Sequence, residues 1–208
     1  MPRKPLISTD EFPYHITNRS NNKEFFYVKI DRLWEIFEDI LIELINSYKI
    51  DVHAFVLMSN HYHLILNTNE NNLSAAMTYL HREVARKSNS YACRTNHFFG
   101  GRYRWCLIQN DLYYRNAIKY VYRNPIEAGL SSSAQDYKFS TLHGIQSNQS
   151  KIKVKQLDFV NDDLIGGLNW INHSFKSPDM NAIKSGLRRK IFKLPTNSSG
   201  GMGRLSFE

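Results

Sequence analysis

The sequence predicts an α+β fold, in which helices cover a ferredoxin-like antiparallel sheet and a mainly helical C-terminal extension follows. Apolar residues recur with helical spacing between residues 31 and 48, and two β-prone runs flank the pair Ser59 and Asn60. The expected elements follow one another in the order β, α, β, β, α, β, α. This is the order of a ferredoxin-like sheet with one added helix.

The first part of the chain is expected to supply three strands and one long helix. Residues 12–19 are β-prone and are followed by an Asn- and Ser-rich turn. Asp31 is an N-cap residue type, and the helix after it carries an apolar stripe of Leu33, Ile36, Phe37, Ile40, Leu41, Leu44, Ile45 and Tyr48. Residues 51–58 and 61–66 then form a hairpin around a two-residue turn.

The next elements are a helix over residues 72–90 and a strand over residues 102–109. The helix after them is capped by Asn110 or Asp111. We expect it to end at Pro125, because the residue before a proline avoids helical geometry.

Residues 1–145 are expected to form the main domain, and residues 146–208 a basic, partly helical extension. Beyond Gly129 the chain is predicted to be irregular and to pack back on the domain through Tyr137 and Phe139. Within the extension, residues 157–173 and 178–192 can each hold a short helix, and the tail from about residue 195 is predicted to be disordered.

The composition indicates a soluble, cytoplasmic protein. Of its 208 residues 42% are hydrophobic, which is enough for a core. Cys93 and Cys106 lack the paired spacing of a disulfide framework, so a reducing compartment is expected. No apolar run approaches the roughly 18 residues that cross a membrane, and the start of the chain lacks the apolar region of a signal peptide.

The charge balance favours a nucleic-acid partner. Lys and Arg exceed Asp and Glu by 27 to 19, and the sequence pI is 9.4. Basic residues lie beside aromatic ones in residues 81–87, 100–105 and 113–123, a mixture that suits phosphates and exposed bases. A membrane-surface helix would separate its basic and apolar faces more sharply.

His61 and His63 form a candidate metal site. On a strand both side chains project from one face, about 6 to 7 Å apart at the backbone, and can converge on one ion. Two imidazoles with an added oxygen donor suit a divalent ion that keeps positions open for substrate oxygens. The same pair also fits two ordinary histidines in a strand.

The helix that begins at Asn110 or Asp111 offers the missing donor. At about 100° per residue, Tyr120 and Asn124 lie together on one edge of its apolar stripe, while Tyr122 lies on the other edge. If the first edge packs over the histidine face, Asn124 can complete the metal site and Tyr120 can act as a nucleophile beside it. An ordinary structural role also fits: tyrosines at the margin of an apolar stripe usually bury their rings, and an asparagine before a proline often ends a helix.

The segment MSNHYHLIL, followed some fifty residues later by YVYRNPIEAGL, resembles the HUH-type single-tyrosine transposases. It is most similar to the REP-associated tyrosine transposases of bacteria. The resemblance covers about residues 12–144 and includes YHITNRSNNKEFF and GGRYRW. The chain departs from the family at Glu127, where a basic residue is common, and at the bulky Tyr62.

The resemblance implies a site and a reaction. His61 and His63 would bind a divalent ion, Mg²⁺ or Mn²⁺, that Asn124 joins. Tyr120 would attack the scissile phosphate, leaving a 5′-phosphotyrosine link and a free 3′-OH. The cut DNA can then be rejoined to another end, so the implied protein is a transposase. The resemblance is compatible with a monomer or a homodimer.

The implied substrate is single-stranded or hairpin DNA, because a site on a strand face under one helix does not easily reach a phosphate inside a duplex. The candidate phosphate contacts are Arg19, Arg82, Arg86, Arg102, Arg104, Lys119 and Arg123. Tyr103 and Trp105 are candidate stacking surfaces for bases.

Two other functions fit part of the pattern. A domesticated relative could bind structured nucleic acid as a regulator without cutting it, in which case the histidines or Tyr120 would have no reason to remain. A metal-dependent phosphodiesterase could use water as the nucleophile, in which case Tyr120→Phe would keep most of the cleavage.

Overall fold

The structure, a computed structural model, describes residues 5–95, 97–155 and 164–194. The tail predicted to be disordered lies outside these residues, as does the start of the helix predicted over residues 157–173. None of the helices in the described ranges is long and apolar enough to cross a membrane.

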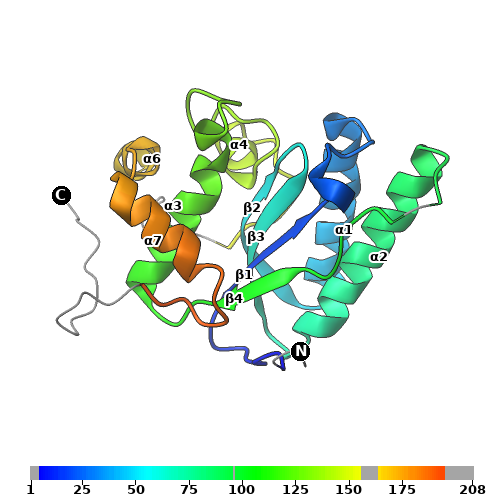
Figure 1. Ribbon diagram of the computed structural model, residues 1–208, viewed down its shortest axis with the longest axis horizontal. Helices are drawn as coiled ribbons and strands as arrows, with labels where there is room; N and C mark the ends of the chain where they lie inside the picture. Colours follow the sequence, from blue (N-terminus) through cyan, green and yellow to red (C-terminus); the bar gives the residue numbers. More distant parts are fainter. Residues whose placement is uncertain (1–4, 96, 156–163, 195–208) are drawn as a thin grey trace.

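The sheet has four antiparallel strands in the order β2-β3-β1-β4. The strands are β1 (Tyr14–Arg19), β2 (Ile50–Leu57), β3 (His61–Thr68) and β4 (Arg104–Leu107). β2 and β3 form the predicted hairpin, in which the Met58 amide donates to the His61 carbonyl. With one helix between β1 and β2 and another between β3 and β4, this is the ferredoxin-like order (Figure 1).

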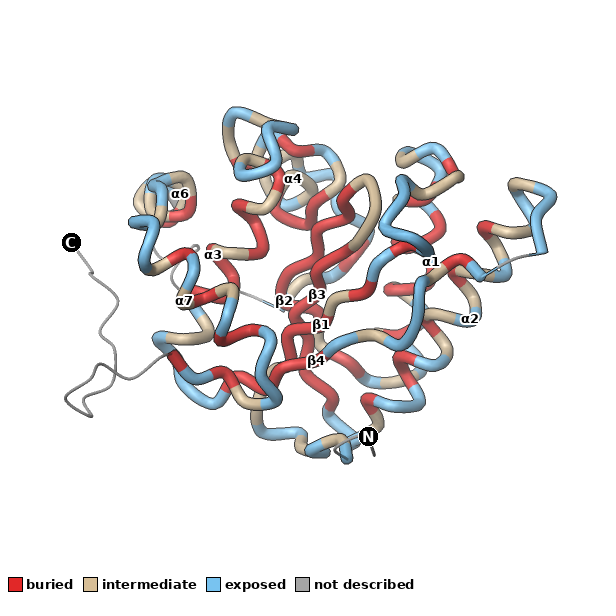
Figure 2. The backbone as a smooth tube through the Cα atoms, viewed as in Figure 1, coloured by how far each residue is buried: buried red, intermediate tan, exposed pale blue. Residues whose placement is uncertain are grey.

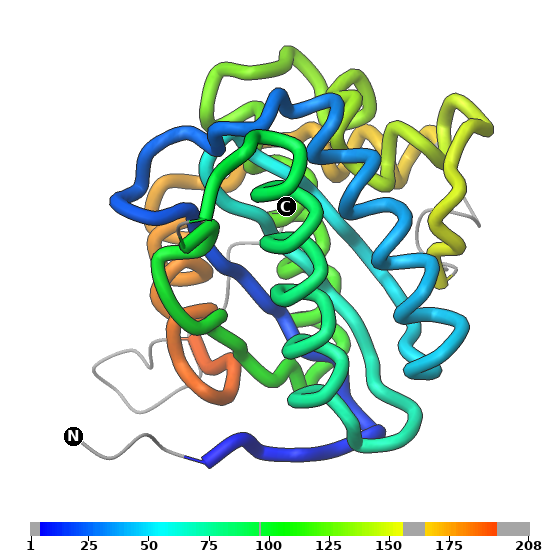
Figure 3. Tube along the Cα trace, turned by 90° about the vertical axis from the view of Figure 1, so that its right-hand side faces the viewer, coloured from blue at the N-terminus to red at the C-terminus, as the bar shows by residue number. Residues whose placement is uncertain are grey.

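Two long helices cover one face of the sheet. They are α1 (Ile30–Ser47) and α2 (Leu73–Tyr91), and Figure 3 shows them side by side across the sheet. Of the predicted stripe on α1, Leu33, Phe37 and Leu41 are fully buried, and they pack with strand residues such as Phe55. This face is therefore closed by an apolar core.

The other face is covered by helices that come later in the chain. They are α3 (Asp111–Glu127), α4 (Thr141–Gln146), α6 (Leu164–Asn172) and α7 (Ser177–Gly186). The sheet thus lies buried between two helical layers (Figure 2). A single 3-10 turn, η1 (Asn21–Lys23), follows β1 at the rim.

Helix α3 corrects the prediction that Pro125 ends it, because the helix continues to Glu127. A proline leaves the carbonyl four residues before it without a helical partner, here that of Val121. The side-chain amide of Asn124 donates to the Tyr120 carbonyl at 2.7 Å and lies 3.5 Å from that of Val121, beside the carbonyl that Pro125 leaves without its partner.

The end of α3 is set by Gly129 instead. Its φ of 68° is left-handed, and its amide donates to the Ile126 carbonyl, while the Leu130 amide donates to the Pro125 carbonyl. These two bonds form a Schellman cap, which glycine favours. At the other end, the predicted cap is confirmed, because the Asn110 side chain accepts from the amides of Leu112 and Tyr113.

The chain after α3 packs back as predicted, through Tyr137 and Phe139. The Tyr137 hydroxyl donates to the Leu57 carbonyl at 2.8 Å. Phe139 packs against the two apolar cores, one on each face of the sheet. Part of this stretch, expected to be irregular, forms α4, because Ser140 caps it by accepting from the His143 amide.

The C-terminal extension is packed into the domain. The Phe192 amide donates to the Leu107 carbonyl and the Leu107 amide to the Lys190 carbonyl, so residues 190–192 run beside β4. Phe192 is 2% exposed and lies against Gly186, where an added Cβ would come within 2.4 Å of its ring. The apolar core between the sheet and α3 therefore includes side chains of the extension.

A bulge in β2 places a buried histidine against α3. Val52 pairs with Leu66 and Ala54 with Ile65, so His53 is an extra residue in its strand. Its Nδ1 lies 2.5 Å from the Tyr114 hydroxyl of α3.

Truncation of Phe192 tests the docking of the extension. We expect Phe192→Ala to lower the free energy of unfolding by about 3 to 5 kcal/mol in urea denaturation, because it empties a buried aromatic site. The control Ile165→Ala, at a residue 74% exposed on α6, should stay within about 0.5 kcal/mol of the wild type. Equal, small losses for both variants would contradict the docking.

The buried His53 makes a second prediction, about pH. Burial lowers the pKa of His53 to about 4, and Lys155 acts in the same direction. The unfolded chain binds this proton below about pH 6.5, and the folded protein does not, so stability falls as the pH drops from about 6.5 towards 4.

We expect His53→Gln to flatten this fall by about 1.4 kcal/mol per pH unit. Urea denaturation of both proteins at pH 7, 6 and 5 measures the two slopes. Parallel slopes would show that His53 is protonated equally well in the folded protein.

Candidate active site

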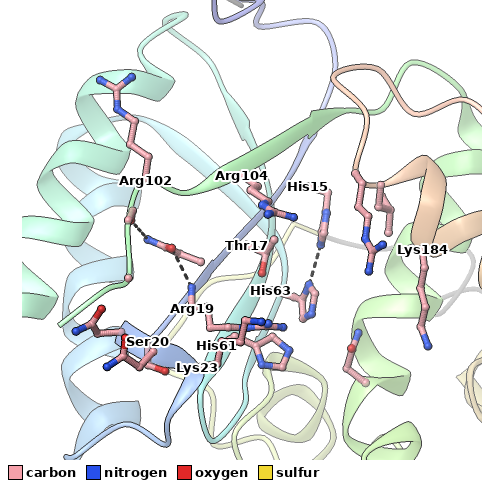
Figure 4. A pocket seen from close by; sticks show the side chains of 18 of the residues that line it. His15, Thr17, Arg19, Ser20, Lys23, His61, His63, Arg102, Arg104 and Lys184 are labelled. Atoms are coloured by element: carbon pink, nitrogen blue, oxygen red, sulfur yellow. Dashed lines mark hydrogen bonds between the residues drawn. The ribbon is translucent and has the colours of Figure 1, made fainter. Parts of the chain in front are cut away.

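A cleft of about 840 Å³ opens on the sheet face that α3 and α7 cover. The ends of β1 and β3 form its floor, Tyr120 and Asn124 of α3 form one wall, and the loop around Gly101 forms another. Figure 4 shows the labelled residues that line it. The cleft contains the predicted histidines, tyrosine and asparagine together.

His61 and His63 project from β3 into this cleft, as the strand period requires. Their ring centroids are 5.1 Å apart. The Nδ1 of His61 lies 2.7 Å from the Asn60 Oδ1, and the Nδ1 of His63 lies 2.9 Å from another histidine, His15. The Nε2 atoms of both rings have no hydrogen-bond partner among the described residues.

The edge of α3 that carries Tyr120 and Asn124 faces these histidines. The centroid of the Tyr120 ring lies 5.6 Å from that of His63, at an interplanar angle of 87°. The Asn124 side chain donates through Nδ2 to backbone carbonyls, which leaves its Oδ1 as the acceptor atom. Tyr122 lies on the other edge and bonds Thr141.

His15 of β1 is a member of the cleft that the sequence analysis did not single out. It is 3% exposed, and its ring stacks on that of His63 with centroids 5.1 Å apart and planes 18° apart. Its position in phase with Thr17 and Arg19 along β1 was the available signal, but only the pairing of β1 with β3 brings it to His63.

The three histidines of the cleft are neutral near pH 7. Burial lowers the pKa of His61 to about 4, with Arg19 acting in the same direction, and lowers the pKa of His15 to about 3. Burial also lowers the pKa of His63 well below its usual range, and the neighbouring histidines and Arg19 add to this effect. Neutral imidazole is the form that binds metals.

The Tyr120 phenol is held protonated by its surroundings. Burial raises its pKa, while the Asn124 amide, Arg188 and Arg19 act in the opposite direction. A bound cation or a proton acceptor would therefore be needed to make it a nucleophile.

The donor set fits a divalent ion through two nitrogens and one oxygen. The free Nε2 atoms of His61 and His63 and the Oδ1 of Asn124 are its available ligand atoms. No group of three or more His, Cys, Asp or Glu side chains in the described ranges could hold a metal ion by itself. The remaining positions would go to water or to oxygens of a substrate.

The cleft carries a strong positive charge. Six basic side chains line it: Arg19, Lys23, Arg102, Arg104, Lys184 and Arg188. None of the described lining residues is Asp or Glu. Three of the six, Arg19, Arg102 and Arg104, are predicted DNA contacts. The other three were not predicted: Lys23 lies in η1, and Lys184 and Arg188 lie in the extension.

In Figure 4, Arg104 of β4 and Lys184 of α7 flank the His15 and His63 pair. These two elements are about eighty residues apart in the sequence. Only the packing of the extension on α3 brings their charges into one cleft, so no local pattern could have indicated it.

Two of the predicted phosphate contacts are buried and lie outside the cleft. Lys119 and Arg123 are 5% and 4% exposed and lie on the side of α3 that meets α6. The Lys119 Nζ is 4.8 Å from the Trp170 ring centroid, and burial lowers its pKa to about 8. Arg123 pairs with Glu127 at 2.8 Å and donates to the Ile171 carbonyl.

The other predicted contacts lie outside the cleft. Arg82 and Arg86 are exposed on α2, across the sheet, where both pair with Glu83. The Tyr103 ring stacks on that of His81, with centroids 5.4 Å apart. Trp105 is 9% exposed and is covered by the Lys190 ammonium, 4.0 Å from its ring centroid, so neither aromatic offers an open face in the cleft.

Comparison with known proteins identifies a matching family and a relative in sequence. Residues 8–124 match the family model described as "Transposase IS200 like". A REP-associated tyrosine transposase of Escherichia coli (strain K12) is 24% identical over 110 residues, 53% of this chain and 65% of that protein. The chain thus aligns with slightly less than two thirds of the relative's length.

A solved structure has the same fold. It is that of a REP-associated tyrosine transposase bound to a REP hairpin, with a TM-score of 0.60 and 18% identity, covering 99% of this chain and all of the other. The family match is longer than half of the chain and runs from before β1 to Asn124. This protein therefore belongs to the IS200-like transposase family.

Proposed function

We propose that this protein is a transposase that cleaves and rejoins single-stranded or hairpin DNA through Tyr120. The observation that carries the proposal is the position of the Tyr120 ring, 5.6 Å from that of His63, in a cleft lined by cations and without a carboxylate among its described lining residues. Such a cleft suits a phosphodiester, and the tyrosine beside the histidines is its only aromatic hydroxyl in the described lining.

Binding would rest on the cations. Arg102 and Arg104 enter from the loop before β4 and from β4 itself, and Arg188 from the chain after α7, so they can contact phosphates on more than one side. The relative solved with a REP hairpin supports a hairpin substrate for this chain.

In the reaction, the Tyr120 oxygen attacks phosphorus. A bond forms between the phenol oxygen and phosphorus, and the bond from phosphorus to the 3′ oxygen breaks. The phenol loses its proton, and the leaving oxygen gains one to become a 3′-OH. The result is a 5′-phosphotyrosine link, whose bond can be passed to another DNA end because no water is consumed.

His61, His63 and Asn124 would hold a divalent ion, Mg²⁺ or Mn²⁺. When bound, such an ion supplies positive charge to the phosphate and to the leaving oxygen. The basic residues Arg19 and Arg188 add to this charge, and both lower the pKa of the Tyr120 phenol. Burial raises the pKa of the phenol, and the two arginines act against this effect, so they favour the deprotonated form that reacts.

Removal of the Tyr120 hydroxyl tests the nucleophile. We expect Tyr120→Phe to abolish the covalent adduct with labelled hairpin DNA in the presence of Mn²⁺, observed by denaturing electrophoresis. His61→Ala and His63→Ala should each reduce adduct formation at least 10²-fold, because they remove ligands to the ion. The adduct should also disappear when EDTA is added.

Tyr122→Phe is the matched control, because this tyrosine lies two residues further along α3 and bonds Thr141 outside the cleft. It should keep the adduct. Cleavage by Tyr120→Phe without an adduct would favour water as the nucleophile, and tight binding without any adduct in the wild type would favour a regulator.

The cations make a separate prediction about binding. We expect Arg104→Ala to weaken the affinity for single-stranded DNA and to lower the slope of log K against log[salt] by about 0.7, the value for one phosphate contact. Arg82→Ala, an exposed arginine across the sheet, should leave both quantities unchanged. Fluorescence anisotropy at 50 to 300 mM NaCl measures both, and equal slopes for the two variants would exclude the cleft as the binding site.

A further inference from the structure

We propose that His15 is a positioning residue, which holds His63 in the tautomer whose Nε2 is free to bind a cation. The inference rests on the proposed function, because it concerns the same metal site. His15 is not itself a ligand in this proposal. It acts through the hydrogen bond that it makes with His63.

The contact between the two rings is well defined. The His15 Nε2 lies 2.9 Å from the His63 Nδ1, and the rings stack with planes 18° apart. Both side chains are buried, at 3% and 6% exposure, so water does not compete for the bond. In the sheet Thr17 is opposite His63, so His15 reaches it diagonally along β1.

The direction of this bond decides whether His63 can bind a metal. A neutral imidazole has one proton for two nitrogens. If His63 donates through Nδ1, its Nε2 keeps a lone pair that faces no other described group. If His15 donates instead, the His63 proton must sit on Nε2, and the ring cannot coordinate through that atom.

The hydrogen bond of His61 shows which of its ring nitrogens carries the proton. Its Nδ1 lies 2.7 Å from the Asn60 Oδ1, and the Asn60 Nδ2 donates to the Lys23 carbonyl at 2.9 Å. That second bond fixes which end of the amide is the oxygen, so His61 must donate through Nδ1. Its Nε2 is therefore the unprotonated nitrogen.

Two rings that bind one ion need the same tautomer. His61 obtains it from an amide oxygen, and His15 is the one partner of the His63 Nδ1 among the residues that the structure describes. An acceptor on the second ring nitrogen is the usual way in which a protein orients a metal-binding histidine, and its loss typically weakens metal binding 10- to 100-fold. His15 fills this position for His63.

The first measurement is the tautomer itself, in metal-free protein. Long-range ¹H–¹⁵N spectra of ¹⁵N-histidine-labelled protein separate protonated from unprotonated ring nitrogens, with assignment from single His→Gln variants. We expect His63 to be protonated at Nδ1 and not at Nε2. Protonation at Nε2 would overturn the inference.

The second measurement is Mn²⁺ affinity, by electron paramagnetic resonance titration. We expect His15→Leu to weaken it about 10- to 100-fold, because no acceptor remains for His63. His15→Gln should retain most of the affinity, since its Oε1 can accept the same bond. Unchanged Mn²⁺ affinity in His15→Leu, with a native thermal transition, would also overturn the inference.

His53→Gln is the matched control. His53 is a buried histidine of the same sheet that bonds an α3 tyrosine outside the cleft, and its replacement should leave Mn²⁺ affinity unchanged. Failure of the proposed function has a different signature: the wild type would bind no Mn²⁺ that depends on His61, while the metal-free spectrum would still report the His63 tautomer.

Discussion

The site depends on how α3 docks on the sheet. The fully buried stripe of Ala117, Ile118 and Val121 holds the helix on the sheet, and hydrogen bonds accompany it at two points. The Tyr114 hydroxyl meets His53 at the β2 bulge, and the Tyr122 hydroxyl meets Thr141. A shift of α3 by one residue would rotate its edge by about 100° and take Tyr120 away from the histidines.

The electrostatics of the cleft follow from the same docking. Helix α3 and the sheet bury His15 and His63 and leave His61 half-buried, so these rings are neutral, while the basic groups come from strand ends, loops and the extension. A phosphate entering the cleft would meet cations first and neutral nitrogens at its floor.

Much of this could be predicted from residue spacing. Helical stripes, the hairpin and the element order predicted the sheet topology, and the edge shared by Tyr120 and Asn124 predicted which side of α3 would face His61 and His63. The predicted end of α3 was wrong, because the cap at Gly129 ends the helix and Pro125 does not. Lys119 and Arg123 are buried against α6 and its flanking chain, which spacing could not predict, because it places a cation on a side of a helix but does not show what covers that side.

The sequence by itself determined the strands, the helices and the residue types that carry the chemistry, because these depend on neighbours within a few positions along the chain. The tertiary structure alone decided which of them meet. His15 reaches His63 through the pairing of β1 with β3, and Lys184 and Arg188 reach the cleft through the packing of α7 on α3. Such contacts join residues far apart in the chain, and their formation depends on the summed packing of both cores, which no local pattern contains.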